Sequence, residues 1–495
     1  MKKAFKALPF WIILLILAMG LSACKTPNKN PVTSDDTTGS QEPTAPVEDP
    51  YTPSVDLTAL DYKAKEIRIL QCSYKVSEFC QEIENTEDVL EEALFKRNER
   101  VETDLNVTLK FPTVNNGSGQ YVYLQAEVTN SVMGGDPSTM YHIVANPAYY
   151  ASGMVTAGLY ADLASFDSYV NLDKQYWSQS FSEANTLNDR YYFLVGELCT
   201  SVLDGLEVVF VNNSLANNYF DSLDFDFYEM VYDQEWTYSK MLELIELAGE
   251  GESTQTWGMA IPCNSHSIDG LLCGFELDIL GRHENGIPYV NVNTAHNFDI
   301  ITALRTLYYN NPSVTTNNAG KVFTDGAAIF HIERMDSAPN FYNAGVDYTI
   351  LPTPKWNAEQ TDYTVITHDE YTALSVCNNL TNEELTMISA VLEDMCYRSH
   401  TTTYPAVYEK IYQLKYNDSP ENVEMFDYIN QHLTYSIGYV YSYALGEAKN
   451  TPRYLLYPES NTWVANVTYP IQSTLSTLAG TVSTKLEELL TYMYK

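Results

Sequence analysis

Side chains that could carry chemistry are abundant in this chain, but they do not fall into a known catalytic spacing. The sequence has 64 acidic residues and 8 histidines, yet it contains no GxSxG, HExxH, GxxxxGK[ST] or GxGxxG pattern. His331 lies in an apolar run and is expected to be a core histidine. We predict no enzymatic activity, no metal and no cofactor, although carboxylate pairs suited to glycoside hydrolysis could be assembled from so many acids.

Aromatic and polar residues follow several predicted strands, where they could hold a polar solute. The chain has 39 tyrosines, and a tyrosine offers an apolar ring face together with a hydroxyl. In open α/β sheets, ligands bind beyond the carboxyl ends of the strands. The candidate ligand-binding residues are Tyr74, Asn146, Trp177, Glu197, Trp257, Arg334, Asp369, Glu370, Tyr371 and Trp463. Each tryptophan could instead pack in the core, but at least two of the three are expected to line the site.

The elements that must position these residues alternate between strands and helices. Strand-like runs at 66–70, 106–111 and 141–145 are separated by helix-like stretches at 86–103 and 121–133. This β-α-β-α-β order predicts a mainly parallel sheet flanked by helices. Further strands are expected at 190–196, 206–211, 257–262, 327–332 and 348–351. Further helices are expected at 213–218, 238–248, 268–280, 298–309, 382–400, 404–414, 422–433 and 474–494.

One stretch near the middle of the chain predicts where two lobes are joined. The run Tyr348–Leu351 is followed by Pro352-Thr353-Pro354. Proline has no N–H to donate and fixes its own φ, so a strand that meets two prolines cannot continue its ladder. We therefore expect Tyr348–Pro354 to be a hinge, with Arg334 on one side of it and Asp369 and Tyr371 on the other.

Length and charge restrict the class of protein. A chain of 495 residues is too long for one core, so two or more lobes are expected. The formal net charge of −36 argues against nucleic acid and anionic lipid as partners, because both require a basic face.

The first residues resemble a processing signal for export. Lys2, Lys3 and Lys6 precede an apolar run, and Leu21-Ser22-Ala23-Cys24 places small residues directly before a cysteine. This is the bacterial lipoprotein pattern, with a signal peptide at 1–23 and lipidation of Cys24. Residues 24–61 are rich in Pro, Thr, Ser and Asp and are expected to form a disordered tether. The folded body should then stand at the outer face of the cytoplasmic membrane.

Four local patterns resemble a known family, the extracellular solute-binding proteins of family 1, and in particular its long clostridial members. Leu94–Val107 resembles the first helix entering the second strand, and Glu235–Met241 resembles a helix that starts at Trp-Thr. Asp347–Trp356, followed by Gln360 and Tyr363, resembles the strand that returns to the first lobe. The helical region that follows the return is matched by Val391–Met395 with Thr403–Ala406 and Tyr408.

The resemblance implies a fold and a function. The fold would be two α/β lobes, each a mainly parallel sheet flanked by helices, joined by crossing strands. Lobe I would comprise 62–197 and 350–445, and lobe II 198–349 and 446–495. The function would be to capture a polar solute, above all a mono- or oligosaccharide, and to deliver it to the permease subunits of an ABC importer. The protein would act as a monomer and would touch the membrane only through its lipid. The alternative is a surface-anchored, carbohydrate-active hydrolase.

Overall fold

The computed structural model describes residues 49–80, 88–114, 120–136, 139–220, 226–408, 419–458 and 468–495. The described residues belong to one compact unit that begins at Asp49. The signal peptide at 1–23 and Cys24 lie outside the described residues, so their assignment stays a prediction. No helix in the described ranges is long and apolar enough to cross a membrane.

The predicted tether at 24–61 is corrected at its end, because the chain is folded from Asp49 onward. Leu57 is buried in a short 3₁₀ turn, Leu57–Ala59. The ring of Tyr51 stacks on His400 at 4.7 Å between centroids. Lys174 donates a hydrogen bond from Nζ to the carbonyl of Asp49 at 3.0 Å. Proline content alone suggested disorder here, but these side chains find partners on the folded body.

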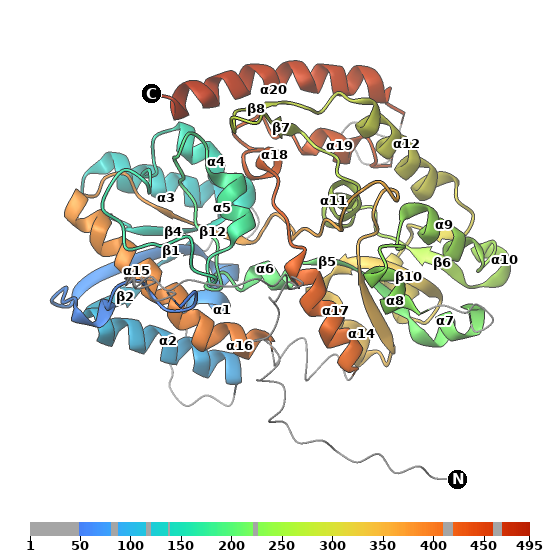
Figure 1. Cartoon of the computed structure of the whole chain (residues 1–495), viewed down its shortest axis with the longest axis horizontal. Coiled ribbons are helices and arrows are strands. Elements are labelled where there is room, and N and C mark those ends of the chain that lie inside the picture. The colour runs from blue at the N-terminus through green and yellow to red at the C-terminus, as the bar shows by residue number, and fades with distance from the viewer. Residues whose placement is uncertain are drawn as a thin grey trace, which may run out of the picture. The chain divides into compact units, whose positions relative to one another are not determined.

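The first lobe is built on a five-stranded sheet (Figure 1). Its strands are β1 (Lys65–Cys72), β2 (Val107–Lys110), β3 (Thr113–Val114), β4 (Ile143–Pro147) and β12 (Thr372–Val376). The order is β12-β4-β1-β2, with β3 also pairing β1, and only β12 runs antiparallel. All five residues of β4 are buried, as expected for a strand covered on both faces. Its helices are α1 (Val76–Phe79), α2 (Val89–Leu105), α3 (Gln120–Gly134), α4 (Ala148–Thr156), α5 (Gln179–Asn185), α15 (Asn382–Thr401) and α16 (Thr403–Val407).

The second lobe contains a mixed five-stranded sheet. Its strands are β11 (Tyr348–Pro352), β5 (Glu207–Asn212), β10 (Ala328–Arg334), β6 (Trp257–Ala260) and β9 (Val314–Thr315), in this order. β5 runs antiparallel to both of its neighbours, while β10, β6 and β9 are parallel. A separate hairpin joins β7 (Leu280–Arg282) and β8 (Pro288–Val290). Two α/β lobes are thus confirmed.

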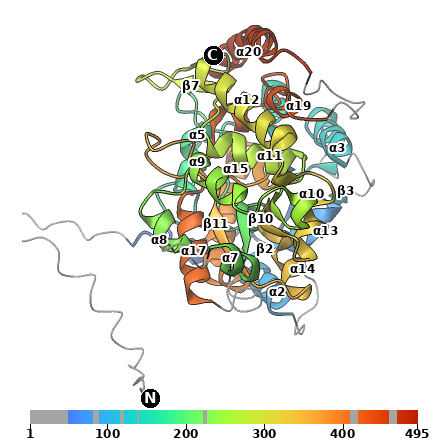
Figure 2. The same ribbon diagram turned by 90° about the vertical axis from the view of Figure 1, so that its right-hand side faces the viewer.

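Helices surround this second sheet in the view of Figure 2. They are α7 (Asn213–Phe220), α8 (Phe227–Tyr232), α9 (Tyr238–Glu246), α10 (Gly251–Thr254), α11 (Ser265–Gly274), α12 (Ala295–Asn310), α13 (Ala319–Thr324) and α14 (Ala338–Asn343). Thr237 caps α9 by accepting a hydrogen bond from the N–H of Lys240 at 3.3 Å, a role for which threonine is well suited. Trp236 before it is completely buried and donates its indole N–H to the Pro352 carbonyl at 2.9 Å.

The predicted hinge at Tyr348–Pro354 and the lobe boundary at residue 350 require correction. Residues 348–352 form β11, and Ile350 pairs with Phe210 inside the second sheet. β11 is an edge strand, where a terminal proline is tolerated. Asn422 of α17 (Pro420–Gln431) covers this edge by bonding the N–H of Ile350 at 3.0 Å and the carbonyl of Tyr348 at 2.9 Å. The crossing therefore begins after Pro352.

Two crossing segments lie side by side between the lobes. The outgoing chain leaves the first sheet near Leu194, which bridges Leu374, and passes α6 (Ser201–Asp204) to reach β5. The returning chain runs from Pro352 to β12 and bridges the outgoing one at Leu206 and Thr367. Three more helices follow, α18 (Ile437–Val440), α19 (Asn450–Tyr454) and α20 (Ile471–Met493).

The terminal helix α20 contacts both lobes. Near its start, Gln472 bonds Asn293 at 2.9 Å, and the helix packs on α12 and β8 of the second lobe. At its end, the carbonyl of Met493 accepts a hydrogen bond from Asn188 at 3.1 Å, and Tyr492 lies beside Tyr192. In Figure 1 this helix runs above both lobes.

Candidate functional site

A cavity of about 700 Å³, called here the main cavity, lies between the two lobes. The first lobe contributes α4 and α5, which reach it from the first sheet. The second lobe contributes α11, the loop after it and β7. The returning crossing segment and the chain around α18 complete the wall. The tyrosines among its lining residues are Tyr149, Tyr371, Tyr435 and Tyr439.

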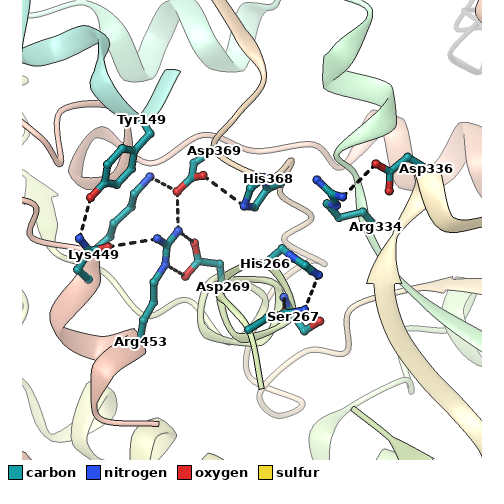
Figure 3. A network of polar contacts seen from close by, with 12 residues as sticks. Tyr149, His266, Ser267, Asp269, Arg334, Asp336, His368, Asp369, Lys449 and Arg453 are labelled. Carbon is teal, nitrogen blue, oxygen red and sulfur yellow. Dashed lines mark hydrogen bonds and ion pairs between the residues drawn. The ribbon is translucent and has the colours of Figure 1, made fainter. Parts of the chain in front are cut away.

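A buried ion-pair network borders the main cavity (Figure 3). Asp269 of α11 pairs with Arg453 of α19 through two guanidinium nitrogens, Nε and Nη2, with Nε at 2.8 Å from Oδ1. Arg453 also contacts Asp369 of the crossing segment at 2.6 Å, and Lys449 contacts the same carboxylate oxygen at 2.5 Å. Burial alone would raise the pKa of Asp369, but Lys449 and Arg453 hold that pKa well below its usual range.

The same network is tied to the first lobe by Tyr149 of α4. The ammonium of Lys449 lies 4.3 Å from the centre of the Tyr149 ring, a cation–π distance. The Tyr149 hydroxyl donates to Glu447 at 3.0 Å and accepts from Asn450 at 2.7 Å. Charges and rings from both lobes thus meet at one border of the main cavity.

A second hollow, called here the minor cavity, has about 200 Å³ and brings together four of the sequence-predicted residues. Tyr74, Arg334, Glu370 and Tyr371 all line it. Arg334 is paired with Asp336 at 3.1 Å, and the Tyr74 side chain is 48% exposed. Tyr371 also lines the main cavity, where Asp369 joins it. The returning chain therefore supplies residues to both cavities.

Three other predicted residues of the first lobe lie elsewhere. Asn146 is fully buried in β4, where its amide donates to the Ala373 carbonyl at 3.0 Å, so it holds the sheet together. Trp177 is 1% exposed and donates its indole N–H to Glu393 at 2.8 Å. Glu197 pairs with His400 at 2.7 Å, and this hydrogen bond raises the pKa of His400.

The expectation that at least two tryptophans line the site is corrected by these positions. Trp177 lines neither the main nor the minor cavity, because its polar edge is taken by a buried carboxylate. Trp257 begins β6, at the end of the strand away from α11, and its ring covers Gly251. Trp463 lies outside the described residues.

Sequence reasoning missed most of the main cavity. Lys449, Arg453 and Asp269 come from helices and loops, where no strand end marks them. Tyr149 stands three residues after Asn146, so the strand-end rule came close to it. Tyr435 and Tyr439 are four residues apart in a tyrosine-rich run, and that spacing was the available signal for a shared face.

Comparison with known proteins gives a fold likeness only. No protein-family model matches the chain, and no curated protein sequence matches it. The structure is similar to an ABC substrate-binding protein from Listeria monocytogenes in complex with cycloalternan, with 12% identity, a TM-score of 0.53, and coverage of 86% of this chain and 99% of that one. A cyclo/maltodextrin-binding protein complexed with maltotetraose gives 11% identity, a TM-score of 0.53, and coverage of 86% and 98%. The GacH receptor of Streptomyces glaucescens, known unliganded and with acarbose, gives 12% identity, a TM-score of 0.50, and coverage of 86% and 99%.

Proposed function

We propose that this protein captures a carbohydrate between its lobes and delivers it to an ABC importer. The observation that carries the proposal is the main cavity, whose wall is shared by both lobes and the crossing chain. Its volume of about 700 Å³ falls in the range of small-molecule sites. The fold likeness to binding proteins holding cycloalternan and maltotetraose supports the choice of a carbohydrate.

The lining suits a sugar chemically. Sugar rings present C–H faces that pack on aromatic planes, and hydroxyls that need directed donors and acceptors. Tyrosine rings provide the planes in the main cavity. Hydroxyl and amide groups provide the partners, from Ser180, Asn291, Thr364, Thr434 and Ser436.

Capture would change the balance between open and closed arrangements of the lobes. A solute that touches both walls binds the closed arrangement more tightly and shifts the population toward it. The permease subunits would then recognise the closed form. In this proposal the protein acts as a monomer, held at the outer face of the membrane by the lipid on Cys24 and by the segment that ends at Glu48.

Binding to a panel of neutral saccharides tests this function. We expect at least one malto- or gluco-oligosaccharide to raise the melting temperature of the full chain and to bind with saturable heat in calorimetry. The alternative, a carbohydrate-active hydrolase, would release shorter sugars during the incubation, which chromatography of the same samples detects. Product release without saturable binding would contradict the proposal.

A further inference from the structure

The end of α11 gives one wall of the main cavity two carboxylates that pair with no lysine or arginine in the part of the chain that the structure describes. Glu276 and Asp278 follow this ten-residue helix and line the main cavity. Neither carboxylate has an ion pair or hydrogen bond with another side chain in the described ranges. The carbonyl end of a helix adds negative potential at the same place. Burial, together with Glu276, raises the pKa of Asp278 to about 6.

The C-terminal end of α5 also lies at the main cavity, and its surroundings differ from those of the end of α11. The carbonyl end of α5 is met by Arg282 of β7, which lies on the opposite lobe. Its guanidinium donates to the carbonyls of Glu183, Ala184 and Thr186 at 3.1, 3.0 and 3.1 Å. An arginine is therefore bonded at the end of α5. At the end of α11 the cap carbonyl of Phe275 contacts the ring of His296 at 2.9 Å, and no lysine or arginine of the described residues pairs with the two carboxylates.

The other two basic residues that line the main cavity, Lys449 and His296, have partners other than Glu276 and Asp278. Lys449 is bound to Asp369, and its side chain is 1% exposed. His296 contacts the Phe275 carbonyl through Nε2 at 2.9 Å and leaves both carboxylates without a bond. A metal ion would need more ligands, and the described residues hold no group of three or more His, Cys, Asp or Glu side chains able to bind one.

Two hydroxyls beside this wall also call for a ligand. The hydroxyl oxygens of Tyr435 and Tyr439 are buried; Tyr435 faces Ser178 and Tyr439 faces the Cys273 thiol, but neither contact has the geometry of a hydrogen bond. Both residues line the main cavity. A buried hydroxyl without a partner is costly, so a polar solute that reaches it gains affinity.

We infer that the main cavity selects a carbohydrate that carries a protonated amine, an amino sugar, with the amine against Asp278 and Glu276. The inference rests on the proposed function and specifies its substrate class. The ammonium supplies the cation that the end of α11 lacks. The tyrosine rings take the C–H faces of the sugar, and the buried hydroxyls bond its hydroxyl groups.

Three disaccharides of one skeleton separate the amine from the ring. They are the β-1,4-linked glucosamine disaccharide, its N,N′-diacetylated form and cellobiose, which carry an amine, an amide and a hydroxyl at the same position. Calorimetry with the full chain at neutral pH should show the free-amine form binding about tenfold or more tightly than the other two, as a charge-assisted hydrogen bond predicts. Asp278→Asn should abolish this preference.

A matched control and a fourth probe make the result decisive. Glu243→Gln removes an acidic group from the exposed face of α9, where its side chain is 58% exposed, and should keep the preference. Equal or tighter binding of a neutral disaccharide overturns the inference and leaves the proposed function standing. Tighter binding of spermidine than of the amino sugar also overturns it. Failure of every saccharide, neutral or amine-bearing, to bind overturns both proposals.

Discussion

Tyr371 lines both the main and the minor cavity, but the other residues that line the two cavities differ in type. Asp369 lines the main cavity, whereas its neighbours His368 and Glu370 line the minor one. These residues form a turn, in which the N–H of Tyr371 bonds the carbonyl of His368 at 3.1 Å, so consecutive side chains leave the chain in different directions. The main cavity has tyrosines and aliphatic residues from several separate elements, while six of the fourteen residues that line the minor cavity are Lys, Arg, Asp or Glu. Charged side chains therefore make up a larger share of the lining of the minor cavity than of the main cavity.

Breaking the ion-pair network at the border of the main cavity should give the largest effect. Arg453→Met leaves Asp269, which is 2% exposed, without its cation. Removing one partner of a buried ion pair costs about 3–5 kcal/mol, so we expect a loss of that size in the free energy of unfolding. Urea denaturation measures it.

The double variant Arg453→Met with Asp269→Asn provides the control for this experiment. It should recover part of the lost stability, because the unpaired charge is then removed as well. Lys321→Met breaks an exposed surface pair with Asp325 and should change stability by less than about 1 kcal/mol. A loss for Arg453→Met no larger than that would show that the network does not stabilise the border of the main cavity.

His368 at the minor cavity and Asp278 at the main cavity should change the free energy of unfolding in opposite directions as the pH falls. Burial lowers the pKa of His368, at the minor cavity, to about 3, among Asp369, His266, Arg334 and Arg453. The unfolded chain binds this proton below pH 6.5 and the folded chain does not, so His368 makes stability fall as pH falls from 6.5 toward 3. The slope is at most about 1.4 kcal/mol per pH unit.

At the main cavity, the raised pKa of Asp278 has the opposite effect on how stability changes with pH. Its stabilising contribution is complete below pH 3.8 and is lost as pH rises through about 6. Unfolding curves at pH 4, 5, 6 and 7 for His368→Gln and Asp278→Asn measure both slopes. We expect His368→Gln to weaken the loss of stability in acid and Asp278→Asn to weaken the loss toward neutral pH. Equal slopes for the two variants would remove the contrast between the cavities.

Removing single aromatic rings tests which cavity holds the proposed saccharide. Tyr435→Ala removes a ring from the main cavity and should weaken saccharide binding about tenfold, the cost of losing a well-packed aromatic contact. Tyr74→Ala removes a ring from the minor cavity and should leave the affinity unchanged. Calorimetry with the tightest saccharide of the panel measures both. A larger loss for Tyr74→Ala would move the solute to the minor cavity.

The smallest effect is expected for Trp257, which lines neither cavity. Trp257→Phe should leave saccharide affinity within about twofold of the original value, because the ring covers Gly251 at the distant end of β6. The same calorimetric titration checks this. A tenfold loss would restore tryptophan as a residue of the site.

The sequence could predict what local rules decide, and those rules cover the two sheets and the minor cavity. Tyr74, Arg334 and Glu370 meet because Tyr74 follows β1, Arg334 ends β10 and Glu370 lies on the returning chain. The predicted lobe boundary at residue 350 was wrong by a few residues. An edge strand can end in proline, so Pro352 is the last residue of β11 and the crossing begins after it. Most of the main cavity could not be predicted, because the ion pair at its border joins Arg453 to Asp269, 184 residues apart.

The terminal helix α20 has a consequence for how quickly a solute can leave. Its 23 residues form a rod of about 35 Å at 1.5 Å rise per residue. One end is fixed near Asn293 and the other near Asn188, on opposite lobes. A rigid rod cannot lengthen, so the lobes separate widely only after one end detaches. The dwell time of a bound solute would then depend on how often the contacts of Tyr492 and Met493 break.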